Sequence, residues 1–115
     1  MRKKNYKGRC TKRSLPKCQS VCRTYDAVQF ACADMLQADD EVTGFRCNVL
    51  LEGLAEGEYT SDFVCEKKGG EVMVCECVSR SHMMKPLTVK LLDLSRNYWL
   101  KHNVSDWRIV IDEDK

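Results

Sequence analysis

The chain has 115 residues, of which 43% are hydrophobic, and a formal net charge of +2 at neutral pH. This length is sufficient for one hydrophobic core and therefore predicts a single folded domain. No apolar run approaches the roughly 20 residues that a membrane-spanning helix needs, which predicts no membrane partner. The N-terminus lacks the apolar segment of a secretory signal, which predicts a cytoplasmic protein.

Hydrophobic periodicity predicts six elements in the order αβββαβ. In chain order these are an amphipathic helix over about 22–38, a strand over 45–51 closed by a turn at 53–57, a hairpin of two strands around 67–70, a helix over about 85–102 and a last strand over 107–111. Pro86 suits the first turn of the second helix. The predicted fold class is α/β, a mixed four-stranded sheet flanked by helices.

Positive charge is concentrated at the N-terminus. Residues 1–25 contain nine of the 19 Lys and Arg residues and none of the 17 acids. We therefore divide the chain into a basic arm, residues 1–21, and a folded domain, residues 22–115. Such an arm suits salt-dependent contacts with the phosphates of DNA, although a short basic terminus can also be merely solubilising. The predicted DNA-binding residues are Arg2, Lys3, Lys4, Lys7, Arg9, Lys12, Arg13 and Lys17.

The eight cysteines allow disulfides, buried thiols or a metal site. A cytoplasmic location argues against disulfides. Five cysteines occupy apolar positions of predicted elements, where a free thiol behaves as a small hydrophobic group. These are Cys32, Cys47, Cys65, Cys75 and Cys77. The spacing lacks the paired Cys-x2-Cys knuckles of common zinc fingers, but a structural zinc held by Cys10, Cys18 and Cys22 stays open as an alternative.

Two acids interrupt runs that otherwise indicate β-strands: Asp62 within 59–64 and Glu76 within 72–78. The sequence Lys-Lys-Gly-Gly at 67–70 predicts a hairpin, because glycine supplies the positive φ of a short connection. With a three-residue loop, Asp62 lies opposite Glu76 on the same face, with Cβ atoms about 5 Å apart, and one divalent ion can bind both. A four-residue loop would turn Glu76 to the other face. The alternative is that these acids lie on a solvated face.

The order αβββαβ, with an acid in the second and third strands, resembles the core of the PD-(D/E)XK nuclease superfamily. In particular it resembles the N-terminal domain of TnsA, the endonuclease subunit of heteromeric transposases. The resemblance covers residues from about 29 to 114. It rests on Gln-Phe-Ala at 29–31 with residues 40–48, on Thr-Ser-Asp-Phe-Val at 60–64, and on Arg-Asn-Tyr-Trp-Leu-Lys at 96–101 leading to Trp107 and residues 109–112.

Compared position by position, the resemblance is incomplete. Asp62 falls on the family's metal-binding aspartate, and Glu76 on the Glu or Gln that opens its E-x-K strand motif. Val78 stands where the family has its lysine, and Gln29 where it has a helix glutamate. The resemblance implies Mg²⁺ or Mn²⁺ held by Asp62 and Glu76, which would polarise a phosphate and activate water. Val78 supplies nothing that a lysine does.

Two residues elsewhere are candidate substitutes. Lys90 lies on the flank of the second helix's apolar stripe, and Asp26 lies one turn before Gln29. The competing interpretation of both is an ordinary solvated charge.

Three functions follow from these observations. The first is a metal-dependent DNA endonuclease of the TnsA type with a divergent active site, using Asp62, Glu76, Gln29 and Lys90. The second is a catalytically inactive nuclease-fold module for DNA binding or transposase assembly, using the basic arm and Trp99. The third is a binding protein organised by cysteine-bound zinc. The partners implied by the first two functions are DNA and other transposase subunits.

Overall fold

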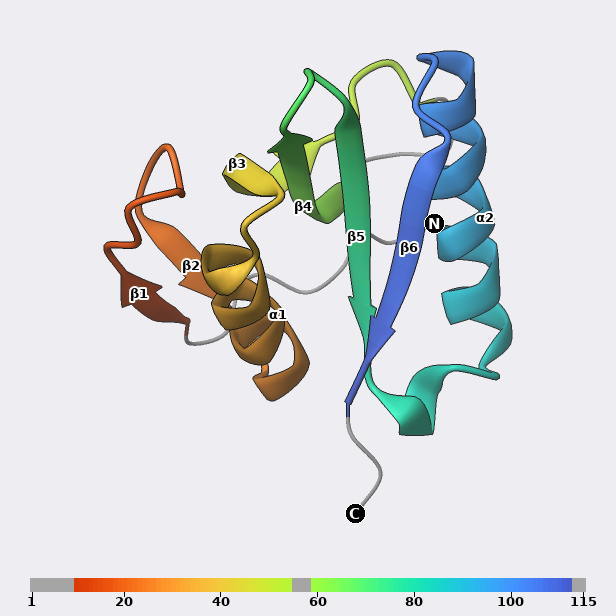
Figure 1. The fold of residues 1–115 in the computed structure, drawn as a ribbon. Coiled ribbons are helices and arrows are strands. Elements are labelled where there is room, and N and C mark those ends of the chain that lie inside the picture. Colours follow the sequence, from red (N-terminus) through yellow and green to blue (C-terminus); the bar gives the residue numbers. More distant parts are fainter. Residues whose placement is uncertain (1–9, 55–58, 113–115) are drawn as a thin grey trace.

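The computed structural model describes residues 10–54 and 59–112 (Figure 1). The elements follow in the order β1 (Thr11–Arg13), β2 (Cys22–Thr24), α1 (Ala27–Ala38), β3 (Val42–Leu50), β4 (Thr60–Lys67), β5 (Val72–Val78), the 3-10 turn η1 (Arg80–His82), α2 (Pro86–Lys101) and β6 (Asp106–Ile111). Within this described part, neither α1 nor α2 is long and apolar enough to cross a bilayer. The predicted turn at 53–57 falls partly on residues outside the described ranges.

The central sheet has four strands in the order β3-β4-β5-β6. The first two pairings are antiparallel, and β5 and β6 are parallel. The predicted mixed sheet with two helices is therefore confirmed, and the predicted order αβββαβ is found from α1 to β6. The parallel pairing follows from the connection through α2, since parallel neighbours need a long crossover.

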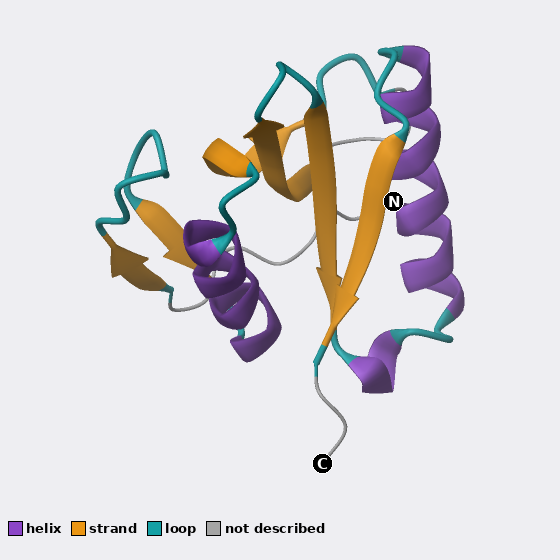
Figure 2. Cartoon of the chain, viewed as in Figure 1, coloured by secondary structure: helices purple, strands orange, loops and turns teal. Residues whose placement is uncertain are grey.

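Each face of the sheet is covered by one helix, which gives the core two layers (Figure 2). Cys32 of α1 shares one core cluster with Phe63. Leu91 of α2 shares the other cluster with Val64 and Val74. The neighbours Phe63 and Val64 belong to different layers because successive side chains of a strand point to opposite faces.

The start of the first helix was predicted too early. Helix α1 begins at Ala27 because the side chain of Asp26 accepts a hydrogen bond from the Gln29 N–H (2.8 Å) and so caps the helix. Residues 22–24 form β2, which pairs antiparallel with β1. This hairpin spans the boundary predicted between the arm and the domain. It is joined to the edge of the sheet, where the Phe45 N–H donates to the Lys17 carbonyl at 2.9 Å.

Candidate functional site

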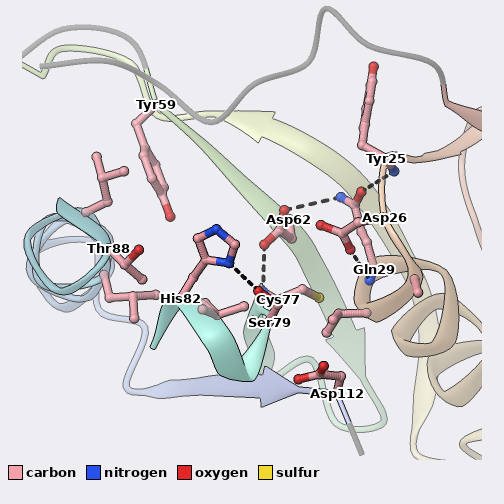
Figure 3. A pocket seen from close by; sticks show the side chains of 15 residues that line it. Tyr25, Asp26, Gln29, Tyr59, Asp62, Cys77, Ser79, His82, Thr88 and Asp112 are labelled. Atoms are coloured by element: carbon pink, nitrogen blue, oxygen red, sulfur yellow. Dashed lines mark hydrogen bonds between the residues drawn. The ribbon is translucent and has the colours of Figure 1, made fainter. Parts of the chain in front are cut away.

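A cavity of about 540 Å³ opens between α1, the end of β5, η1 and α2 (Figure 3). Three of the four positions at which the TnsA-like family has functional residues line it: Gln29, Asp62 and Val78. Glu76 is not among the lining residues. Asp62 projects into the centre of the cavity in Figure 3. Of the two acids that were predicted to act together, only Asp62 lines this cavity.

Asp62 is 3% exposed and is held from two sides. Its Oδ1 accepts from the Gln29 Nε2 at 3.2 Å, and its Oδ2 accepts from the backbone N–H of Cys77 at 2.6 Å. The Gln29 Oε1 accepts from the Tyr25 N–H at 2.8 Å, which fixes the amide nitrogen toward Asp62 and toward the Asn48 Oδ1 at 2.9 Å. Gln29 therefore acts as a buried donor to the carboxylate.

Glu76 is completely buried and is held beneath α2. Its Oε2 accepts from the Ser95 hydroxyl at 2.6 Å. Its Oε1 accepts from the Tyr59 hydroxyl at 3.1 Å and from the backbone N–H of Asp62 at 3.3 Å. The Trp107 Nε1 donates to the same Ser95 oxygen at 3.0 Å, which extends the buried network to β6. A buried carboxylate requires such donors, and here Ser95 of α2, Tyr59 and the backbone of β4 provide them.

Asp62 and Glu76 differ in the helix that each carboxylate contacts. The loop does consist of residues 68–70, with positive φ at Gly69 and Gly70, and the register is the predicted one, with Phe63 opposite Cys75. The antiparallel ladder ends at that pair, however. Beyond it, the Asp62 carboxylate turns toward α1 and the Glu76 carboxylate turns toward α2.

The physical reason is a break in the pleat of β4 at Asp62. Ser61 and Phe63, two residues apart, should share a face, yet Ser61 accepts from the Trp99 Nε1 under α2 at 2.9 Å while Phe63 lies in the α1 layer. On β3, Asn48 has φ = 53° and is missing from the ladder that pairs its neighbours with β4. The irregularity at Asn48 of β3 and Asp62 of β4 redirects the Asp62 side chain. The alternation of side chains along a regular strand does not predict this change.

The residues present do not fit the magnesium site that the resemblance implies. The Asp62 carboxylate accepts from Gln29 of α1 and the Glu76 carboxylate from Ser95 of α2, these donors are neutral, and Val78 is apolar. Within residues 10–54 and 59–112, the only group of three or more Cys, His, Asp or Glu side chains whose ligand atoms all lie within 4.8 Å of one another is Cys18, Cys22 and Cys47.

The proposed substitutes do not complete an acidic site. Lys90 is exposed and does not line the cavity. Asp26 does line it, but its carboxylate caps α1. Trp99, predicted as a contact for DNA or a transposase, is only 9% exposed, and its Nε1 donates to Ser61. The structure therefore brings Gln29 and Asp62 together and leaves Lys90 outside.

The described basic residues of the arm differ in whether their side chains are exposed or already engaged in contacts within the chain. Lys12 is exposed. Arg13 is engaged within the chain: it pairs with Asp34 at 2.6 Å, and its guanidinium lies 3.7 Å from the centre of the Phe30 ring. Lys17 donates to the Asp39 carbonyl at 2.7 Å. The remaining predicted DNA-binding residues lie outside the described residues: Arg2, Lys3, Lys4, Lys7 and Arg9.

Three polar residues that the sequence analysis did not assign also line the cavity: Ser79, His82 and Asp112. The Ser79 hydroxyl lies 2.5 Å from the His82 Nδ1, and the Asp112 Oδ1 accepts from the Arg80 N–H at 2.6 Å. Their positions directly after β5 and β6 could have indicated them, because the carboxyl ends of parallel strands meet at one edge of a sheet, where ligands commonly bind.

Six of the described cysteines are buried in the core. Four of them were predicted there: Cys32, Cys65, Cys75 and Cys77. A side-chain contact with Cys75 raises the pKa of Cys65, and burial raises it further. Cys47 is half-buried, packs against the same core cluster and lies with Cys18 and Cys22. Cys10, predicted as a zinc ligand, is not part of that group.

A scan of the sequence against protein-family models finds no match, and a search against curated proteins finds no significant similarity. The resemblance to TnsA-type nucleases therefore rests on the motifs and on the order of the elements.

Proposed function

We propose that this chain is a nuclease-fold module that binds DNA without cleaving it. The observation that carries the proposal is the position of Glu76, whose carboxylate is bound by Ser95 and Tyr59 beneath α2 and does not line the cavity that Asp62 lines. Phosphodiester cleavage by a nuclease site of this kind needs carboxylates around one metal and a cation to stabilise developing charge. The cavity holds a neutral Gln29 and an apolar Val78 at two of those positions.

DNA binding is supported by the charge of the N-terminal region. The first 25 residues hold nearly half of the basic residues and no acid, while all 17 acids lie in the rest of the chain. Such an asymmetry favours attachment to a polyanion through one end of the molecule. By its resemblance to TnsA, the module would assemble with other transposase subunits on DNA.

Nicking of a supercoiled plasmid tests the loss of cleavage. We expect no nicking by the wild type with Mg²⁺ or Mn²⁺. The double variant Gln29→Glu with Val78→Lys places a second carboxylate and an ammonium group in the cavity beside Asp62, and nicking restricted to this variant would support the proposal. Wild-type nicking that is abolished by Asp62→Asn would contradict it and favour the active endonuclease.

Salt-dependent binding to duplex DNA tests the other half of the proposal. Deletion of residues 1–9 removes five basic residues and leaves the β1–β2 hairpin intact. We expect weaker binding and a weaker salt dependence. The slope of log K against log salt should become shallower by about 0.9 for each lost phosphate contact, that is by up to about four to five if all five residues contact phosphates. The control replaces the exposed Lys85, Lys90 and Lys101 by glutamine. Loss of binding in this control alone would place the DNA surface on α2.

A further inference from the structure

The group Cys18, Cys22 and Cys47 unites two parts of the chain that are distant in sequence. Cys18 lies in the connection between β1 and β2, Cys22 begins β2, and Cys47 lies in β3. Their three sulfur atoms all lie within 4.8 Å of one another. Three thiolates around a tetrahedral Zn²⁺, with Zn–S bonds of about 2.3 Å, would be separated by about 3.8 Å. The sulfurs therefore need only small shifts to surround one ion.

The backbone holds each of the three cysteines in place. Residue 18 forms a parallel bridge with Phe45 at the edge of β3. Cys22 pairs with Arg13 in the β1–β2 hairpin, and Cys47 pairs with Phe63 of β4. Each ligand thus belongs to a hydrogen-bonded segment, so binding an ion would not need to order a loose loop.

Two of the sulfurs also accept hydrogen bonds from backbone N–H groups. The Arg23 N–H donates to the Cys47 Sγ at 3.5 Å, and the Ser20 N–H donates to the Cys18 sulfur. N–H donors stabilise the anionic form of the acceptor and orient it, as the outer partners of metal ligands do. The Cys47 Sγ also lies 3.7 Å from the Val21 carbonyl, to which the protonated thiol donates.

Burial makes the anionic forms of Cys18 and Cys22 unfavourable without a cation. Burial, followed by the nearby Cys47 and Cys18 sulfurs, raises the pKa of Cys22 to about 12. Burial likewise raises the pKa of Cys18. A doubly charged ion would compensate this cost, and its binding would release the thiol protons to solvent. Because thiolates are soft ligands, they select Zn²⁺ or Cu(I) over Mg²⁺.

We propose that Cys18, Cys22 and Cys47 bind one Zn²⁺ ion, with water in the fourth position, and that this ion fastens the β1–β2 hairpin to β3. Up to three S–H protons leave to the buffer as three Zn–S bonds form, and no oxidation occurs. The site is separate from the Asp62 cavity and does not depend on DNA binding. It replaces the ligand set that cysteine spacing suggested, since Cys47 takes the place of Cys10.

The full chain, purified with a reductant and without a chelator, tests the proposal by zinc analysis and by replacement with Co²⁺. We expect one zinc per chain and, with Co²⁺, a thiolate-to-metal charge-transfer band in the near ultraviolet. Cys47→Ser, at a half-buried position, and Cys22→Ser should each lose the band and the stoichiometric zinc. Cys10→Ser is the matched control and should keep both.

A second measurement uses the wild type alone and therefore tests the proposal even if the cysteine variants fail to fold. Zn²⁺ added to metal-free, reduced wild type should raise its melting temperature, whereas Mg²⁺ at the same concentration should not. The proposal is overturned if Zn²⁺ produces neither stabilisation nor a stoichiometric complex, or if Cys10→Ser abolishes binding as Cys47→Ser does. It is equally overturned if thiol titration and mass show a disulfide within the group in the wild type before any oxidant is added.

Discussion

Replacing Gln29 by glutamate is the most informative single change in this molecule. The Gln29 Nε2 donates to Asn48 at 2.9 Å and to Asp62 at 3.2 Å, so the substitution turns two buried donor–acceptor contacts into contacts between acceptors. Each buried hydrogen bond broken in this way costs about 1–3 kcal/mol, which gives about 2–6 kcal/mol in total. That loss is a large part of the roughly 5–15 kcal/mol by which a domain is stable.

The sign of the pH dependence follows from the two carboxylates. The new glutamate beside Asp62 would raise the pKa of one of the pair above its value in the unfolded chain. Protonation of that group removes the repulsion. The loss of unfolding free energy relative to wild type should therefore be small near pH 4–5 and grow as the pH rises toward 8. Mn²⁺ at neutral pH should recover stability in the variant and not in wild type, because it balances the added charge.

Thermal unfolding at several pH values, with and without Mn²⁺, measures these effects. Gln37→Glu in the same helix is the matched control: the Gln37 Oε1 already accepts from the Lys17 N–H at 3.0 Å, so a carboxylate keeps that bond. A Gln29→Glu protein as stable as wild type at pH 8 would refute the buried contact between Gln29 and Asp62.

The remaining predictions concern the network beneath α2 and one ion pair. Glu76→Gln should lower stability by about 1–3 kcal/mol with no response to Mg²⁺, since an amide nitrogen must then face at least one of the former donors; a metal-dependent change would contradict the structural role. Ser95→Ala should cost a similar amount, measured by urea denaturation, because it leaves the Trp107 N–H and Glu76 each without one partner. The hydrogen bond from Lys67 lowers the pKa of Asp106, so Asp106→Asn should cost about 0.5–1 kcal/mol at pH 7, a difference that disappears as the pH falls below about 4; an unchanged difference at pH 3 would refute it.

The fold was predictable where turn glycines and the spacing of apolar residues agreed with the elements of the structure. Gly69 and Gly70 indicated the hairpin, and the structure gives both a positive φ, at 88° and 86°. The apolar spacing of the second helix placed it within one residue at each end, at Pro86–Lys101. The start of the first helix was missed because Asp26 is a stronger signal than the apolar residues that precede it, as its side chain supplies the cap.

The candidate site was less predictable, because it depends on a distortion and on contacts that are distant in sequence. The register placed Asp62 opposite Glu76, but the break at Asp62 redirects its side chain, and the only local sign is Asn48, a residue type that tolerates a positive φ. Cys47 looked like a core position of a strand. Only the packing of β3 against the hairpin brings it to Cys18 and Cys22.

The bonds at the break show how Gln29 opposes metal binding in this cavity. Beyond the last ladder pair, the two strands remain joined through side chains: Asp62 accepts from the Cys77 N–H of β5, and Glu76 accepts from the Asp62 N–H of β4. A divalent ion that captured the Asp62 carboxylate would have to displace a buried donor at a cost of about 1–3 kcal/mol, and Gln29 would lose one of its hydrogen bonds. Gln29→Glu removes that donor and adds a ligand in a single step. If Mn²⁺ stabilises this variant while Gln37→Glu and the wild type do not respond, the Gln29 amide is one of the features that keep this cavity from binding a divalent ion.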